Sequence, residues 1–394
     1  MLIYFLFWLA IGITLYTYFG YIMLLWLPCT IKRKRRHLTA MNQNQLPDVT
    51  IIIAAHNEER YIIPKYQNTL SLNYPSQKVH QVWVTDGNTD NTSEILKSLQ
   101  NITLINSPQR LGKALSINKA MELVKTPITI FTDANTYLSP NSLVDLVKLF
   151  ENPKVGCVAG QKKIRCDDTD GLASKGEGIY WRYESLIKKL ESCTGSTVSG
   201  AGELYAIRTN LFKPLPGNTI LDDFEISANI IYQGYRIKYV HQAIASEAGS
   251  LTVDDEKKRK VRIAAGCFQA LVRHINLLNP IKNAEIAFKF FSHKVLRWIF
   301  VPPIIIAIPF LNAIILFLNQ SNSITYTLTF AAISFFYGMV AIGYLIRHSA
   351  RLSSWITFPY YGFMMNINMM KGFIRFTMGK QSHIWDKAKR KTDI

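Results

Sequence analysis

Three short acidic motifs hold the side chains best suited to chemistry in this chain. They are VTDGNTDNT at 84–92, TDANT at 132–136 and LDDFE at 221–225. Each of the first two closes a run with the composition of a β-strand. In open parallel α/β sheets, ligands bind beyond the carboxyl ends of the strands. Asp, Asn and Thr at those positions therefore predict a polar ligand site.

The spacing within TDANT indicates a divalent cation. Asp133 and Asn135 stand two residues apart just beyond a strand, so their oxygens can face one ion. Mg²⁺ or Mn²⁺ prefers oxygen donors and commonly takes one or two protein ligands plus substrate phosphates. The alternative is that Asp-Gly-Asn and Asp-Ala-Asn are only turn sequences. Their occurrence at two strand ends of one sheet favours the metal site.

The elements that must position these motifs alternate between strand and helix over 47–161. Predicted strands lie at 49–55, 81–85, 102–106, 127–132 and 155–159. Predicted helices lie at 58–71, 93–99, 113–124 and 142–150. Apolar runs such as VTIIIAA fit central parallel strands covered on both faces. The fold class is therefore α/β, a doubly wound and mostly parallel sheet. The stretch from 162 to 279 is less regular, with a helix expected after Asp222.

Uncharged segments of membrane length flank this region. Residues 2–27 carry no charge, and neither do residues 298–346, which are long enough for two spans that turn at 319–323. The segment 352–370 is also uncharged but contains Pro359 and two asparagines, so we expect it to be interfacial or re-entrant. The expected domains are a transmembrane helix at 1–30, a soluble domain at 45–280, an interfacial helix at 281–297, two transmembrane helices at 298–346, the segment 352–370 and a basic tail at 371–394.

The basic residues predict the topology and argue against nucleic acid. The cluster at 32–36 and the basic tail both belong on the cytoplasmic side by the positive-inside rule. We therefore expect a multi-pass protein of the cell membrane with its soluble domain in the cytoplasm. The net charge of +18 suits anionic lipid headgroups near the spans. No module with a basic, aromatic stripe that would bind nucleic acid is visible.

The five cysteines show no metal-ligand spacing. Four of them fall in the region expected to be cytoplasmic, where thiols stay reduced. We therefore expect all five to be packing residues. They are Cys29, Cys157, Cys166, Cys193 and Cys267.

Two common nucleotide fingerprints are absent from the sequence. A nicotinamide-binding sheet would carry GxGxxG after its first strand, but AAHNEE at 54–59 contains no glycine. A Walker A loop would need a glycine five residues before Gly112, where Ser107 stands. The ligand is therefore expected to bind without either of these glycine-rich phosphate-binding loops.

The order of the motifs resembles that of membrane-embedded family 2 glycosyltransferases with the GT-A nucleotide-sugar fold. The resemblance runs from about 47 to 273, and more loosely through the flanking spans to Trp385. It is carried by PDVTIIIAAHNEE (47–59), TDGNTDNT (85–92), RLGKALSINKAM (110–121), TDANT (132–136), LDDFE (221–225) and RKVRI (259–263). Among relatives, the layout looks like that of bacterial polysaccharide synthases of the cellulose, poly-N-acetylglucosamine and hyaluronan type.

The resemblance implies roles for individual residues. Asp86 would contact the nucleobase, Lys113 would approach the nucleotide, and TDANT would be the metal-binding DxD motif. The residues implied to bind the donor are Asn57, Glu59, Asp86, Lys113, Asp133, Lys260 and Arg262. The acceptor would lie near Gly200, Gly202, Glu203 and Asp222, although Glu203 can equally be structural.

The implied reaction is attack by an acceptor hydroxyl on the anomeric carbon of a nucleotide sugar, with inversion. It needs a base near the hydroxyl and positive charge at the departing diphosphate. Asp223 matches the base motif, with Asp222 or Glu225 as the alternatives. Asp222 also suits the start of a helix, where a carboxylate is favoured.

Four sequence features leave alternatives open. Asn135 replaces the second DxD carboxylate, so weaker metal affinity is expected. Ile263 replaces the tryptophan on which processive relatives stack the acceptor sugar. The run at 257–262 can also be a solvated helix face or a lipid-contacting patch. Tyr180-Trp181-Arg182-Tyr183 could line a sugar path, but aromatic residues at helical spacing are more typical of packing or interfacial positions.

The expected donor is a nucleotide sugar, with a UDP-sugar favoured, and the acceptor a membrane lipid or glycan. Transfer of one or a few sugars is favoured over the processive synthesis of a polysaccharide, because Ile263 offers no ring and few helices are available for a channel. A partner subunit or a homo-oligomer could complete such a channel. A rival of another class is a non-catalytic nucleotide-binding subunit of a synthase complex. A transporter fits poorly, with too few spans and no charge within them.

Overall fold

The computed structural model describes residues 1–32, 45–165, 172–250, 252–318, 323–347, 353–382 and 384. Several sequence predictions concern residues outside this set. They are most of the basic cluster at 32–36, Cys166, most of the turn at 319–323, and Trp385 with the basic residues that follow it.

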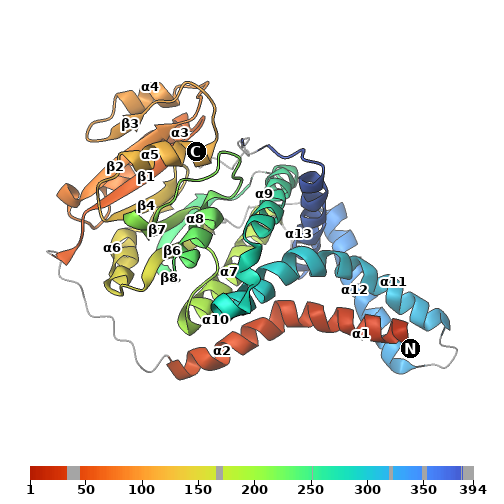
Figure 1. Cartoon of the computed structure of the whole chain (residues 1–394). Coiled ribbons are helices and arrows are strands. Elements are labelled where there is room, and N and C mark those ends of the chain that lie inside the picture. Colours follow the sequence, from red (N-terminus) through yellow and green to blue (C-terminus); the bar gives the residue numbers. More distant parts are fainter. Residues whose placement is uncertain are drawn as a thin grey trace.

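An eight-stranded mixed sheet forms the centre of the soluble domain (Figure 1). The strand order is β3-β2-β1-β4-β7-β6-β8-β5, and β1 pairs in parallel with both β2 and β4. Strand β7 runs antiparallel to its neighbours β4 and β6. The strands are β1 (Val49–Ala55), β2 (Val79–Thr85), β3 (Thr103–Ile105), β4 (Ile128–Asp133), β5 (Tyr137–Leu138), β6 (Val155–Arg165), β7 (Leu204–Arg208) and β8 (Arg236–Ala248).

Helices cover both faces of the sheet because successive residues of the central strands point to opposite sides. Ile52 of β1 packs in a core with α5, α8 and α9, whereas Ile51 and Ile53 pack in a second core with α3, α4 and α6. The helices of this domain are α3 (Glu59–Leu70), α4 (Thr92–Lys97), α5 (Lys113–Glu122), α6 (Ser142–Val147), α7 (Leu172–Thr194), α8 (Asp222–Tyr232) and α9 (Val253–Arg273). Short 3₁₀ turns occur at Ser76–Lys78, Lys148–Glu151, Thr209–Leu211 and Ile275–Leu278.

The predicted α/β fold class is confirmed, and most elements before residue 160 lie close to their predicted bounds. Strand β5 was not predicted, and β6 continues to Arg165, past its predicted end at 159. Strand β1 covers the predicted residues, and helices α3 to α6 begin within one residue of prediction. The second half differs. Strands β7 and β8 were not predicted, and β7 makes the sheet more mixed than expected.

Three helical segments are long and apolar enough to cross a membrane. They are Leu2–Thr30, Pro280–Leu318 and Ile324–Leu345. The second is a continuous helical run in which a π-helical stretch, η8, follows α10, so the expected interfacial helix at 281–297 continues directly into the span. The elements are α1 (Leu2–Leu15), η1 (Tyr16–Gly20), α2 (Tyr21–Lys32), α10 (Pro280–Phe290), η8 (Phe291–Phe300), α11 (Val301–Leu318) and α12 (Ile324–Leu345).

Helix α13 (Ser354–Thr377) stands beside α9, between the sheet and the apolar helices (Figure 1). It contains the segment expected to be interfacial or re-entrant. A Cβ added at Gly372 would lie 2.3 Å from the Cβ of Ala264 on α9. The glycine therefore permits the close approach that brings α13 to the soluble domain.

The cysteines depart from expectation in one respect. Cys29, near the end of α2, and Cys193, near the end of α7, form a disulfide. The expectation that both are separate packing residues is therefore wrong, because folding brings together two positions that are 164 residues apart in sequence. Cys157 and Cys267 are free and buried, as expected of packing residues.

Candidate active site

A cavity of about 320 Å³ lies beyond the carboxyl end of β4. Two of the acidic motifs line it directly, through Asp133 and Asn135 after β4 and through Asp222 and Asp223 at the start of α8. Helices α7, α9, η8 and α13 contribute the remaining walls. The arrangement brings side chains from both halves of the soluble domain to one place.

Asp86 is buried at the end of β2, where it organises the loop before α5. One carboxylate oxygen accepts hydrogen bonds from the backbone N–H groups of Leu111 (2.6 Å) and Gly112 (3.1 Å), and the other accepts one from Gly112 (3.0 Å). Gly112 has a φ of 93°, which a residue with a side chain rarely adopts. Asp86 thus fixes the backbone that presents Lys113, and its contact with a nucleobase stays a prediction.

Asn57 and Glu59 connect the loop after β1 to the loop after β2. The side chain of Asn57 accepts a hydrogen bond from the backbone N–H of Thr89 (2.8 Å) and donates one to its hydroxyl (3.0 Å). Glu59 accepts one from the backbone N–H of Asn91 (3.1 Å). These contacts hold the two loops together at the sheet edge, and neither side chain lines the cavity, whereas His56 and Glu58 do.

Lys113, at the first turn of α5, lies between two carboxylates. Its Nζ is 2.9 Å from Oδ1 of Asp133 and 3.4 Å from Oδ2 of Asp222. Burial lowers the pKa of Lys113, but the two carboxylates outweigh burial and the net shift is upward. Lys113 is therefore a firmly protonated cation that joins the motif after β4 to the motif that starts α8.

The side chains at the end of β4 fit a divalent cation that also binds substrate oxygens. Asp133 and Asn135 both line the cavity, and Oδ2 of Asp222 is buried and accepts no hydrogen bond in the described part of the chain. Within those residues, no group of three His, Cys, Asp or Glu side chains could hold a metal alone. Such a set suits Mg²⁺ or Mn²⁺, which commonly keep positions for phosphate oxygens.

Lys65, a buried lysine for which no role was predicted, supports the TDANT loop. Lys65 of α3 donates hydrogen bonds to the hydroxyl of Thr132 (3.0 Å) and to the carbonyl oxygen of Thr136 (2.9 Å). Burial lowers the pKa of Lys65 to about 7. The lysine occupies an ordinary helix position in the sequence, so only the folded structure reveals that it holds the TDANT loop.

Asp223 faces the same cavity from the start of α8. A Cβ added at Gly202 would lie 3.4 Å from Oδ2 of Asp223, so the glycine leaves the carboxylate accessible. Burial raises the pKa of Asp223, and the carboxylates of Asp222 and Glu203 raise it further, to about 6. A carboxylate with this pKa is ionised at neutral pH yet basic enough to accept a proton.

The two alternatives to Asp223 are engaged elsewhere. Asp222 lies near Lys113, as described above. Glu225 is 3.2 Å from Arg273 and 3.2 Å from His274 on the far side of α8, and it does not line the cavity. Gly200 also lines the cavity, and its N–H donates to Ser227 Oγ (2.8 Å). The geometry thus leaves Asp223 as the carboxylate best placed to act as a base.

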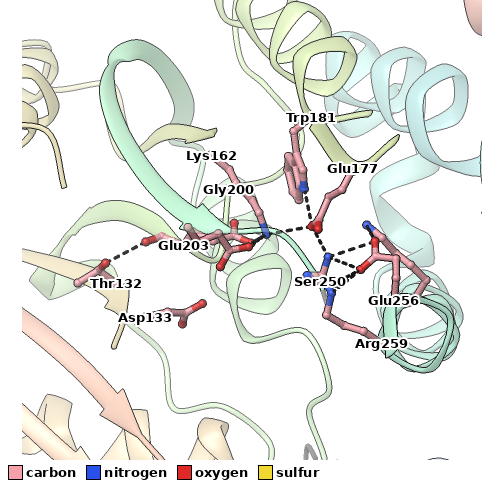
Figure 2. Close-up of polar contacts among 12 residues, drawn as sticks. Thr132, Asp133, Lys162, Glu177, Trp181, Gly200, Glu203, Ser250, Glu256 and Arg259 are labelled. Atoms are coloured by element: carbon pink, nitrogen blue, oxygen red, sulfur yellow. Dashed lines mark hydrogen bonds and ion pairs between the residues drawn. The ribbon is translucent and has the colours of Figure 1, made fainter. Parts of the chain in front are cut away.

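Glu203 belongs to a buried network of charges (Figure 2). Lys162 lies 2.5 Å from Glu203 and also pairs with Glu247, while Arg259 of α9 pairs with Glu177 of α7. Burial would raise the pKa of Glu203, but the Lys162 ammonium outweighs it and lowers the pKa. The backbone carbonyl of Glu203 accepts a hydrogen bond from Thr132 (3.0 Å), which links the network to the TDANT loop.

The basic run on α9 is buried at Lys260, partly buried at Lys257, Arg259 and Arg262, and exposed at Lys258. Lys260 is 5% exposed, lies 3.5 Å from Glu256 and stands over the ring of Tyr180 at 4.7 Å. Burial lowers its pKa. Arg262 lines the cavity. The alternative of a wholly solvated helix face is therefore wrong for this part of α9, whereas contact of Lys260 or Arg262 with a diphosphate stays a prediction.

The cavity wall opposite the sheet was not predicted. Tyr180 and Trp181, for which packing was favoured, line the cavity from α7. Trp298 of η8 and Asn368 of α13 line it as well. No motif marks these last two positions, which lie in the flanking helices.

Comparison with known proteins decides the family of the soluble domain. The family model described as glycosyl transferase family 2 matches residues 50–207. Residues 50–207 form a family 2 glycosyltransferase domain. This domain contains β1 to β7 and the TDANT loop, while Asp223 and α9 lie beyond the matched segment.

Two curated relatives of the glycosyltransferase domain are similar over more than half of the chain. Poly-beta-1,6-N-acetyl-D-glucosamine synthase of Staphylococcus aureus (strain COL) is 26% identical over 246 residues, covering 59% of this chain and 58% of the relative. The synthase of the same name from Staphylococcus epidermidis (strain RP62A) is 25% identical over 249 residues, covering 61% and 59%. The match thus spans less than two thirds of each relative.

A solved structure shows that the glycosyltransferase domain has the GT-A fold. The mannosyltransferase PcManGT from Pyrobaculum calidifontis, in complex with GDP-Man and Mn²⁺, superimposes with a TM-score of 0.68. The two are 20% identical, and the match covers 95% of this chain and all of that one. The match therefore extends beyond the sheet to the flanking helices.

Proposed function

We propose that this chain is an inverting glycosyltransferase that moves a sugar from a nucleotide-sugar donor to a membrane-associated saccharide or lipid acceptor. One observation carries the proposal: Asp223, with a pKa of about 6, lines the same cavity as Asp133 and Lys113. A general base and a cation-rich site for a leaving diphosphate are the two requirements of this transfer.

The donor side of the cavity is the edge that carries Lys113, Asp133 and Asn135. A bound Mg²⁺ or Mn²⁺ would supply positive charge to the diphosphate, held by Asp133 and Asn135. Lys113 would contribute a second positive charge, because its protonated form is favoured by the neighbouring carboxylates. A UDP-sugar is our favoured donor, and GDP-mannose is the natural comparison since PcManGT binds GDP-Man with Mn²⁺.

The acceptor hydroxyl is proposed to approach Asp223 from the wall formed by α7, η8 and α13. Asp223 would take the hydroxyl proton as the oxygen attacks the anomeric carbon. The bond from that carbon to the diphosphate breaks, and the negative charge goes to the departing nucleoside diphosphate. Gly202 leaves room beside the carboxylate for the acceptor.

The topology proposed with this function has three spans and a cytoplasmic soluble domain. The segments Leu2–Thr30, Pro280–Leu318 and Ile324–Leu345 supply the spans. The basic residues that follow the first span and those of the tail would then lie on the cytoplasmic side. Nucleotide sugars would reach the cavity from the cytoplasm, and the acceptor would reach it at the membrane surface.

A processive synthase is the second candidate, and the names of the staphylococcal relatives favour it. Purified protein in lipid nanodiscs would be incubated with each of several UDP-sugars or GDP-mannose, with Mg²⁺ or Mn²⁺. Nucleoside diphosphate release and product length would be measured. Donor-specific release with products extended by one or a few sugars supports our preference, and long chains beside unextended acceptor support the synthase. No release above that of the Asp223→Asn variant with any donor would contradict both.

A further inference from the structure

The wall of the cavity opposite Asp133 contains a buried amide without a partner. Asn368 of α13 is 2% exposed and lines the cavity. Its Nδ2 donates no hydrogen bond to any part of the chain that the structure describes. Buried donors are nearly always paired in proteins, and an unpaired one is costly. An oxygen of a bound ligand would satisfy this donor.

An aromatic ring on the same wall lies next to the proposed base. Trp298 of η8 lines the cavity, and its ring centroid is 6.1 Å from that of Phe224, the residue after Asp223. Among the described residues, its indole N–H has no hydrogen-bond acceptor. Trp181 differs in its indole N–H, which points to Glu177 (3.4 Å). A lysine stands over each ring, Lys162 over Trp181 at 4.7 Å and Lys294 over Trp298 at 5.7 Å. Trp298 is therefore the ring with a polar atom left for a ligand.

The lysines of this wall are already engaged. Lys294 lies 2.9 Å from Glu184, and Lys188 donates to the carbonyl oxygen of Gly200 at 2.6 Å. Lys260 pairs with Glu256, as described above. Carboxylates neutralise Lys294 and Lys260, and the carbonyl oxygen of Gly200 occupies the ammonium of Lys188, so these lysines are less available to a phosphate. A neutral amide and a neutral ring instead suit hydroxyl oxygens and the apolar C–H face of a sugar.

We infer that Trp298 and Asn368 form the binding site for the terminal sugar of a saccharide acceptor. Asn368 donates a hydrogen bond to a sugar oxygen, and Trp298 offers its ring face beside Asp223. The inference rests on the proposed function and narrows the acceptor to a glycan. It also assigns to helices outside the matched domain a specificity role that no motif marks.

Isosteric substitution separates this role from a structural one. Asn368→Leu removes the unpaired donor and keeps the volume, so we expect a higher unfolding temperature without ligand together with weaker binding of saccharide. Asn366→Ala is the matched control on the same helix, because the Asn366 amide already donates to Tyr18 (3.1 Å) and Gly362 (2.8 Å) and does not line the cavity. Trp298→Phe retains a smaller ring, and Trp298→Ala removes it.

The measurement uses the full chain in nanodiscs with a panel of neutral oligosaccharides built from β-1,6-linked N-acetylglucosamine, glucose or mannose. Wild type is expected to bind at least one member of the panel. Asn368→Leu and Trp298→Ala should each weaken that binding about tenfold or more, the loss expected for one hydrogen bond or one ring contact. Trp298→Phe should lose less, and Asn366→Ala should bind as wild type does.

Two readouts keep this inference separate from the proposed function. Donor turnover to water, measured as nucleoside diphosphate release without acceptor, should be the same in wild type and in the control Asn366→Ala. Absence of release in wild type would contradict the proposed function instead. Release in wild type with no oligosaccharide bound, or with binding unaffected by both substitutions, would overturn the inference. Binding of polyprenyl phosphate without binding of any oligosaccharide would also overturn the inference.

Discussion

The ammonium of Lys113 lies 2.9 Å from the carboxylate of Asp133, the residue expected to bind the metal. The pair joins α5 to the loop after β4, and Asp222 lies close enough to interact with the same ammonium group. One lysine thus neutralises the carboxylates that a divalent cation would use. Metal and nucleotide binding must therefore redistribute the charge around Lys113.

Replacing this lysine should move metal affinity and catalysis in opposite directions. In Lys113→Met, the Asp133 carboxylate loses its partner, so Mn²⁺ is expected to bind severalfold more tightly. Transfer should fall about 100-fold or more, because an electrostatic contact to the leaving group is lost. Mn²⁺ binding by electron paramagnetic resonance and the rate of nucleotide release check the two effects. Lys119→Met, at an exposed position of the same helix, is the control. Weaker Mn²⁺ binding in Lys113→Met would contradict the idea that Lys113 and the metal compete for the Asp133 carboxylate.

The pKa of Asp223 predicts an acidic limit to activity. The base must be deprotonated, and its pKa of about 6 lies above the usual range for aspartate. Activity should therefore be full above pH 7 and should decline as the pH falls through about 6. The pH dependence of kcat/KM reports this group in the free enzyme. A profile that stays flat down to pH 4.5, with the protein still folded, would exclude Asp223 as the titrating base.

The network around Lys162 should be essential for stability. Lys162→Met leaves Glu203 and Glu247 without their shared cation, and breaking a buried pair in this way costs about 3–5 kcal/mol. We expect a clear fall in the midpoint of thermal unfolding. Lys163→Met changes the exposed neighbour and should alter stability by less than about 0.5 kcal/mol. Equal midpoints for the two variants would show that the network contributes little.

The disulfide between Cys29 and Cys193 should protect both cysteines from alkylation. Alkylation of the denatured protein without reductant should leave both residues unmodified, and reduction should make both reactive. Cys193→Ser should expose Cys29 without reduction. Mass spectrometry of the peptides measures each state. The cytoplasm keeps thiols reduced. Labelling of both residues without reductant in the purified, air-oxidised protein would contradict the disulfide, whereas labelling of both thiols in intact cells is expected of a cytoplasmic domain.

The sequence predicted the positions of the acidic motifs in the fold because these motifs follow strands or open a helix with clear patterns, while the roles of their residues stay predictions. Asp86, Asp133 and Asp223 each stand at the end of a strand or the start of a helix, where local sequence indicates both the element and its boundary. The parallel order of β1, β2 and β4 brings Asp86 and Asp133 to the same edge of the sheet, whereas Asp223 comes from α8, after the antiparallel strand β7. Local patterns and one topological rule were enough for these positions.

The rest of the site depends on contacts that local sequence does not encode. Lys65 and Lys162 acquire their roles only because folding buries them next to residues far away in the chain. Trp298 and Asn368 lie in helices whose sequences indicate membrane proximity and nothing more specific. The disulfide was missed for the same reason, since a predicted compartment outweighed a contact that only the tertiary structure shows.

Transfer by the Asp223→Asn variant tests the central claim most directly. Asparagine keeps the size of the side chain and removes its basicity. Nucleotide-sugar binding and sugar transfer would be measured side by side for wild type, Asp223→Asn and Glu225→Gln, a nearby carboxylate that does not line the cavity. We predict that Asp223→Asn binds the donor as tightly as wild type but transfers no sugar, while Glu225→Gln transfers at a rate close to wild type. Transfer by Asp223→Asn at the wild-type rate would contradict the account.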